Sequence, residues 1–147
     1  HTAIHSFPTR RSSDLECGAG GAPKSVVERA VRLKGVSAYD KYFVLVDADL
    51  PFECDAELER RMRKKPHLEI LTATPCIEGL LLAILDVNFS PSAVTAGECK
   101  RIFERRYLPK DRKTYKHSYA RIFSRQMIDA RRGSVPELDA ILRAMGV

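Results

Sequence analysis

The most constraining feature of the sequence is a short apolar run that ends in two aspartates. Residues 42–46 read Tyr-Phe-Val-Leu-Val, and Asp47 and Asp49 follow directly. A continuous run of β-branched and aromatic residues bounded by charge predicts a strand that is covered on both faces. Such strands belong to α/β folds, in which ligands bind beyond the carboxyl ends of the strands. We therefore expect the two aspartates at a ligand-binding edge of a sheet.

The segments around this run alternate between extended and helical patterns. The predicted elements are a strand remnant at 16–17 before a glycine turn, a helix from Pro23 to Lys34, a charged helix at 55–65, a strand at 68–72, a helix that starts at Thr74-Pro75 and is apolar through 77–85, and helices at about 95–107, 116–130 and 135–145. The order strand, helix, strand, helix, strand, helix predicts parallel pairing with right-handed crossovers. The expected fold is a small parallel α/β sheet flanked by helices.

Charge divides the chain into a nearly neutral part and a basic part. Residues 100–147 hold 13 Lys/Arg against 5 Asp/Glu, whereas residues 1–99 hold 12 against 14. A basic tail beside an acidic centre suits nucleic acid, although a solvated, lysine-rich surface would have the same composition. The candidate nucleic-acid-binding residues are Lys110, Arg112, Lys113, Lys116, Arg121 and Arg125. The last two are expected one turn apart on the predicted helix at 116–130.

Membrane insertion and secretion are not indicated. The longest apolar stretch, at residues 79–85, is too short to cross a bilayer, and the N-terminus has no secretory signal pattern. The four cysteines form no CxxC pair, so the sequence indicates neither a zinc site nor a disulfide framework. These features predict a cytoplasmic protein with reduced thiols.

The acidic pair predicts a metal site but does not select one chemistry. Asp47 and Asp49 point to the same side of an extended chain, and their mutual repulsion favours a cation between them. The expected ion is Mg²⁺ (or Mn²⁺), held by one or two carboxylates and substrate phosphate oxygens. The same motif resembles those of haloacid-dehalogenase-type phosphatases and GT-A glycosyltransferases, but the chain offers no second acidic pair after residue 86 and too few residues for two sugar-nucleotide halves. Both classes stay rivals of a nuclease, and a solvated turn after the strand is the alternative to a metal site.

Glu78 is the third candidate residue of this site. It lies in the first turn of the apolar helix, where it either complements the helix dipole or is partly buried and requires a partner. A metal shared with Asp47 and Asp49 would supply that partner, so we take these three acids as the candidate catalytic residues. A lysine near the metal would stabilise charge on a phosphate, and the candidates are Lys110, Lys113 and Lys116.

Two segments together resemble the RloB-like family, whose members carry a TOPRIM-type domain. They are residues 39–49, Tyr-Asp-Lys-Tyr-Phe-Val-Leu-Val-Asp-Ala-Asp, and residues 75–82, Pro-Cys-Ile-Glu-Gly-Leu-Leu-Leu. The resemblance covers about residues 16–130 and implies a metal-dependent nuclease with Asp47 and Asp49 as metal ligands and Glu78 as a further site residue. It also implies a phage-defence or restriction system and an ATPase partner. Ile77 departs from the family, which has an aromatic residue at that position.

The start of the chain does not fit this family. Residues 1–15 contain FPTRRSSDL, which resembles a translated sequencing adaptor, and we expect this segment to be non-native and loosely attached. The expected organisation is then a TOPRIM-like core at 16–92 that lacks its first strand, followed by a basic helical region at 93–147. The glutamate of the family's first strand has no counterpart here. The nuclease, a non-catalytic module that binds nucleic acid or an ATPase partner, and a phosphatase or glycosyltransferase that uses the same acidic pair therefore all stay open.

Overall fold

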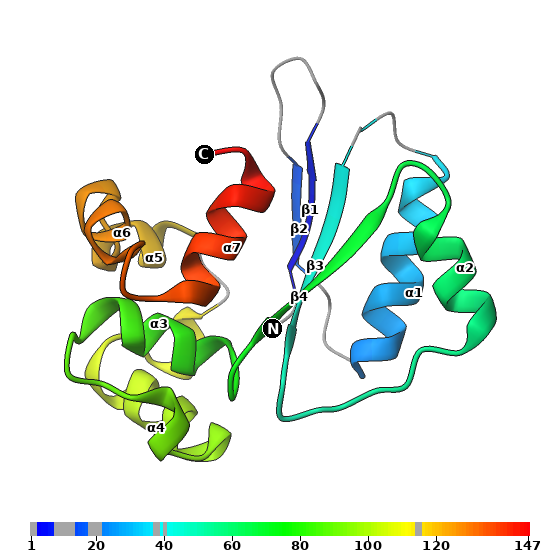
Figure 1. Ribbon diagram of the computed structural model, residues 1–147. Helices are drawn as coiled ribbons and strands as arrows, with labels where there is room; N and C mark the ends of the chain where they lie inside the picture. The colour runs from blue at the N-terminus through cyan, green and yellow to red at the C-terminus, as the bar shows by residue number, and fades with distance from the viewer. Residues whose placement is uncertain (1–2, 8–13, 18–21, 37–38, 40, 114–115) are drawn as a thin grey trace.

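A computed structural model describes residues 3–7, 14–17, 22–36, 39, 41–113 and 116–147. These residues form a mixed sheet and seven α-helices (Figure 1). The strands are β1 (Ala3–Phe7), β2 (Asp14–Cys17), β3 (Lys41–Asp47) and β4 (Leu68–Ala73). The helices are α1 (Pro23–Lys34), α2 (Ala56–Arg63), α3 (Ile77–Leu85), α4 (Ala96–Arg106), α5 (Lys116–Ile122), α6 (Arg125–Arg131) and α7 (Pro136–Met145), with 3-10 turns η1 (Pro91–Ala93) and η2 (Lys110–Arg112). None of these helices is long and apolar enough to span a bilayer.

Within the described residues, the sheet has the strand order β2-β1-β3-β4 and one parallel pair, β3 with β4. Strand β1 runs antiparallel to both of its neighbours, β2 and β3. The predicted α/β class is thus confirmed, but the prediction of a wholly parallel sheet is wrong. The difference arises from residues 3–7, which we expected to be loosely attached and which instead form the strand between β2 and β3. Strands β2 and β3 still run in the same direction, with β1 between them.

Helices cover both faces of the sheet (Figure 1). Helices α1 and α2 lie against one face, and their apolar residues pack on alternate residues of β3, namely Tyr42, Val44 and Val46. Helix α7 lies against the other face and contacts β4. Pro23 occupies the first turn of α1 and valines supply its buried stripe, so the predicted bounds of this helix are confirmed.

Helix α3 is the central helix of the second half of the molecule. Its buried residues contribute to two apolar clusters, one with α7 and β4 and the other with α4. The predicted central position is confirmed, because a helix that is apolar nearly all round must be covered on more than one side. Its start is later than predicted, since Cys76 is the N-cap and Pro75 lies in the connection from β4.

The predicted helix at 116–130 is wrong, because the structure divides it into α5 and α6. The side chain of Ser124 accepts a hydrogen bond from the backbone N–H of Met127 and so begins a new helix. Arg121 and Arg125 consequently lie on different helices rather than one turn apart. The helix predicted at about 95–107 is confirmed as α4, whose N-terminus carries a capping box formed by Thr95 and Glu98.

Candidate metal centre at the carboxyl edge of the sheet

The candidate site lies where β3 and β4 end side by side. Asp47, the last residue of β3, is in register with Ala73, the last residue of β4. The turn after β3 is held against the connection between β4 and α3 by two backbone hydrogen bonds. Ala48 donates to the carbonyl of Ala73 at 3.0 Å, and Asp49 donates to the carbonyl of Pro75 at 2.9 Å. These contacts bring the predicted residues Asp47 and Asp49 to the edge at which α3 begins.

Asp47 is buried and contacts the start of α3. Its Oδ1 accepts a hydrogen bond of 2.7 Å from the backbone N–H of Ile77, in the first turn of that helix. Burial raises the pKa of Asp47, the nearby charge of Glu78 raises it further, and the hydrogen bond from Ile77 opposes both effects. Burial therefore outweighs the hydrogen bond from Ile77 and the nearby charge of Lys100, and the pKa of Asp47 lies above its ordinary value. A cation placed at this edge would stabilise the charged form of Asp47.

Glu78 is buried at the same edge, with 5% of its surface exposed. Its Oε1 accepts a hydrogen bond of 2.7 Å from Nζ of Lys113. Its Oε2 is buried and has no hydrogen-bond partner among the residues described. Burial alone would raise the pKa of Glu78, but Lys113 outweighs it and holds this pKa below its ordinary value. Glu78 is therefore an ionised carboxylate, and one of its oxygens has neither a donor nor a cation among the residues that the structure describes.

Two lysines approach the three acids. Lys113 is itself buried, and its Nζ lies 2.7 Å from both Glu78 and Glu104. Lys100 of α4 is half-buried, and its Nζ lies 3.5 Å from Oδ2 of Asp49. Burial would lower the pKa of Lys100, but the attraction of Asp49, Asp47 and Glu78 raises it above its ordinary value.

The sequence predicted Lys113 as one of three candidates near the site and missed both Lys100 and Glu104. These two residues lie one turn apart on α4, beside its buried residues Cys99 and Phe103. That position at the border of a buried stripe is the signal that could have found them. The pattern gives no partner, however, because Asp49 and Lys100 are 51 positions apart in the chain.

The residues at this edge offer two carboxylates, rather than three, to a hard divalent cation. Within the described part of the chain, no group of three or more His, Cys, Asp or Glu side chains is arranged to hold a metal ion. Mg²⁺, however, is usually held by only one or two carboxylates, with water and substrate phosphates completing its shell. Asp47 and Asp49 can provide those carboxylates. Oε2 of Glu78, which has no partner within the described ranges, could accept a hydrogen bond from water on such an ion.

The predicted basic residues are distributed over different elements. Lys110 and Arg112 are exposed on η2, Arg121 is exposed on α5, and Arg125 is exposed on α6 with its Nε 3.6 Å from Asp129. Lys113 is committed to two carboxylates inside the candidate site. The side chain of Lys116 lies outside the described part of the structure.

No protein-family model matches this chain, and neither does any curated protein or solved structure. The functional interpretation therefore rests on the residues of the carboxyl edge and their geometry.

Proposed function

We propose that this chain is a metal-dependent nucleic-acid phosphodiesterase with a TOPRIM-like site, as in RloB-like proteins. The observation that carries the proposal is the burial of Asp47 and Glu78 at one strand edge, with Oε2 of Glu78 left without a partner among the described residues. The charge of Glu78 raises the pKa of Asp47, so the two buried carboxylates repel each other, and a shared cation would relieve that repulsion. The ion proposed is Mg²⁺ or Mn²⁺, held by Asp47 and Asp49.

The residues of the site have distinct roles in this proposal. When bound, the ion activates water and neutralises phosphate charge. Oε2 of Glu78 would help to hold the ion or would accept a proton from water, while Lys113 keeps Glu78 ionised and fixes the position of Oε1. Lys100 supplies a positive charge beside Asp49, where it can stabilise the additional charge that builds up on a phosphate.

A second candidate function is a non-catalytic module that binds nucleic acid or an ATPase partner. The specific observation in its favour is that two lysines already offset part of the acidic charge. Lys113 pairs with Glu78 and Lys100 pairs with Asp49, so these acids have cationic partners in the protein itself. The phage-defence setting and the ATPase partner are implied only by the resemblance to RloB-like proteins.

Cleavage and metal binding by the Asp47→Asn variant test the proposal. Asn keeps the size of the side chain but removes the charge, so we expect Mn²⁺ binding by calorimetry to be lost. Cleavage of labelled RNA or DNA in Mg²⁺ should fall at least ~100-fold, because the ion supplies several kcal/mol and about 1.4 kcal/mol is tenfold in rate. The control is Asp111→Asn, which removes an equal charge from an exposed acid on η2.

The outcomes separate the two functions. A wild-type chain that binds nucleic acid but cleaves none in Mg²⁺ or Mn²⁺ would reject the phosphodiesterase and support the binding module. Release of inorganic phosphate from small phosphomonoesters, without cleavage of polymers, would reject it in favour of a phosphatase that uses the same acidic pair.

A further inference from the structure

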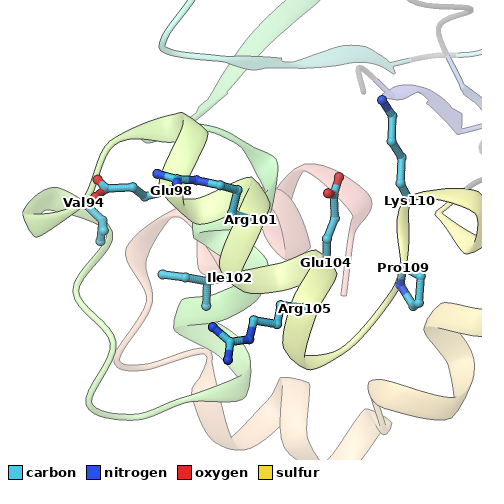
Figure 2. A pocket seen from close by; sticks show the side chains of 8 residues that line it. All are labelled: Val94, Glu98, Arg101, Ile102, Glu104, Arg105, Pro109 and Lys110. Atoms are coloured by element: carbon cyan, nitrogen blue, oxygen red, sulfur yellow. The ribbon is translucent and has the colours of Figure 1, made fainter.

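A groove with a volume of about 700 Å³ runs beside α4 (Figure 2). Its lining combines three basic, two acidic and three apolar residues: Arg101, Arg105, Lys110, Glu98, Glu104, Val94, Ile102 and Pro109. All of them come from α4, from the segment before it or from the turn after it. The groove thus combines cationic side chains with aliphatic surface.

Both acids of the groove are already engaged. Glu98 accepts hydrogen bonds from the backbone N–H and the hydroxyl of Thr95, at 3.0 and 2.7 Å, in the capping box of α4. Glu104 pairs with the buried amino group of Lys113 at 2.7 Å. Both carboxylates keep their negative charge, because Thr95 offers Glu98 only neutral donors and Lys113 is shared between Glu104 and Glu78.

The three cations, in contrast, are available. Within the residues that the structure describes, the side chains of Arg101, Arg105 and Lys110 form no ion pair or hydrogen bond. Arg101 helps to lower the pKa of Glu98 only as a nearby charge, after the hydrogen bonds from Thr95. With three cations against two carboxylates, the groove has a formal excess of one positive charge.

The groove adjoins the candidate metal centre. Lys100, the neighbour of Arg101 on α4, contacts Asp49 of the acidic pair. Glu104, the neighbour of Arg105, is joined through Lys113 to Glu78. Lys100 and Glu104 lie one turn apart on α4, and so do Arg101 and Arg105. The first pair is on the side of α4 toward the three acids, and the second pair is on an adjoining side toward the groove.

We propose that the α4 groove binds a single strand of nucleic acid and leads it to the carboxyl edge of the sheet. This proposal rests on the proposed function for the cleavage that follows, but not for the binding itself. Guanidinium groups bind phosphates in a bidentate manner, and Val94, Ile102 and Pro109 supply apolar surface for sugars and bases. We take a single strand as the occupant because a groove of about 700 Å³ has the size of a small-molecule site. The contacts are to phosphates, so the sequence preference is weak.

Fluorescence anisotropy with labelled oligonucleotides in EDTA tests the binding apart from catalysis. The variant is Arg101→Gln/Arg105→Gln, and the control is Arg61→Gln/Lys65→Gln, which removes the same charge from exposed residues at the end of α2, on the opposite face of the sheet. We expect the groove variant to weaken single-strand binding about 10- to 100-fold. For this variant, the slope of the logarithm of the binding constant against the logarithm of the salt concentration, measured between about 50 and 200 mM, should flatten by about 1–2 units. The control should leave the slope unchanged.

Three results would overturn the proposal: equal effects of the two double variants, equal affinity for duplex and single strand, or no binding of any oligonucleotide by the wild type. Unfolding in urea must show that both variants are folded, as their exposed positions lead us to expect. Failure of the nuclease proposal would look different, since binding in EDTA would persist and respond to Arg101 and Arg105 while cleavage in Mg²⁺ remained absent.

Discussion

One buried ammonium group holds two carboxylates at the candidate site. The side chains of Lys113 and Glu78 are 6% and 7% exposed, and that of Glu104 is 31% exposed. Burying charged groups is costly unless each is paired, and removing one partner leaves an uncompensated charge in a low-dielectric environment. Lys113 is therefore expected to be a structural requirement of the site as well as a determinant of its charge.

Lys113→Met should destabilise the protein by about 3–5 kcal/mol at pH 7, measured by urea unfolding. Lys113 lowers the pKa of Glu78 below 4.5, so this interaction contributes stability above pH 4.5 and loses it as the pH falls through the folded-state value. Without Lys113, burial raises the pKa of Glu78, and the folded variant takes up a proton more readily. The difference from the wild type should therefore shrink as the pH falls from 7 toward about 4.

The double variant Lys113→Met/Glu78→Gln provides the control, because it removes the charge that Lys113 compensates. It should be less destabilised than Lys113→Met alone, and the deviation from additivity measures the pair. Additive effects, or a loss of stability that does not depend on pH, would show that the two residues are not coupled.

The acids of the site were predictable from the sequence because each follows a local signal. Asp47 and Asp49 follow a buried strand, and Glu78 is the one charged residue in the first turn of an apolar helix. Lys100 and Glu104 were not predictable in the same way. Their contacts depend on how α4 packs against α3. The sequence near Lys100 gives no sign that its amino group will lie beside Asp49, which is far away in the chain.

At the scale of the elements, the close packing of α3 on α4 depends on Gly79. A Cβ at Gly79 would lie 2.9 Å from Cδ of Pro75 and 3.3 Å from Sγ of Cys99. The first distance is too short for ordinary contact, and neither the proline ring nor the thiol, which is buried, can move easily. Gly79 therefore sets the distance between the start of α3, which carries Glu78, and α4, which carries Lys100.

Gly79→Ala should lower the free energy of unfolding by about 1–3 kcal/mol through overpacking. Gly97→Ala in α4 is the matched control, since no atom lies within 4 Å of its added Cβ. Alanine is the better helix former, so the control should be neutral or stabilising by up to about 1 kcal/mol. Denaturant unfolding of the two variants checks the contrast. A Gly79→Ala protein as stable as the control would mean that α3 and α4 are not in close contact.

The elements themselves were largely predictable, and the exceptions have local causes. The bounds of α1 were predicted correctly from Pro23 and the valine pattern, and the apolar body of α3 from its composition. The division between α5 and α6 was missed because the apolar period continues through residues 122–128, whereas the serine at 124 caps a new helix. A capping side chain overrode periodicity there.

At the scale of the whole molecule, the order of the strands could not be predicted. Pairing in a sheet is non-local, and a segment without clear periodicity gives no indication of which strand it will join. Strand β1 lies between β2 and β3 and aligns Ala3 with Cys17 on one side and with Leu45 on the other. The strand that carries Asp47 is thus paired along both edges, with β4 on one side and β1 on the other.

A proline in β1 tests whether this segment is an integral strand. His5 is paired with Leu15 and Phe43, at the centre of both ladders. Proline has no N–H to donate and is not tolerated inside a central strand, so His5→Pro should cost about 3 kcal/mol and speed hydrogen exchange of the β3 amides that donate to β1. The β4 amides that donate to β3 should stay protected, because the parallel β3–β4 pair does not involve β1. An unchanged free energy of unfolding and unchanged exchange in β3 would show instead that residues 3–7 contribute nothing to the sheet, as the adaptor-like sequence led us to expect, and that the acidic pair is positioned by β3, β4 and α3 alone.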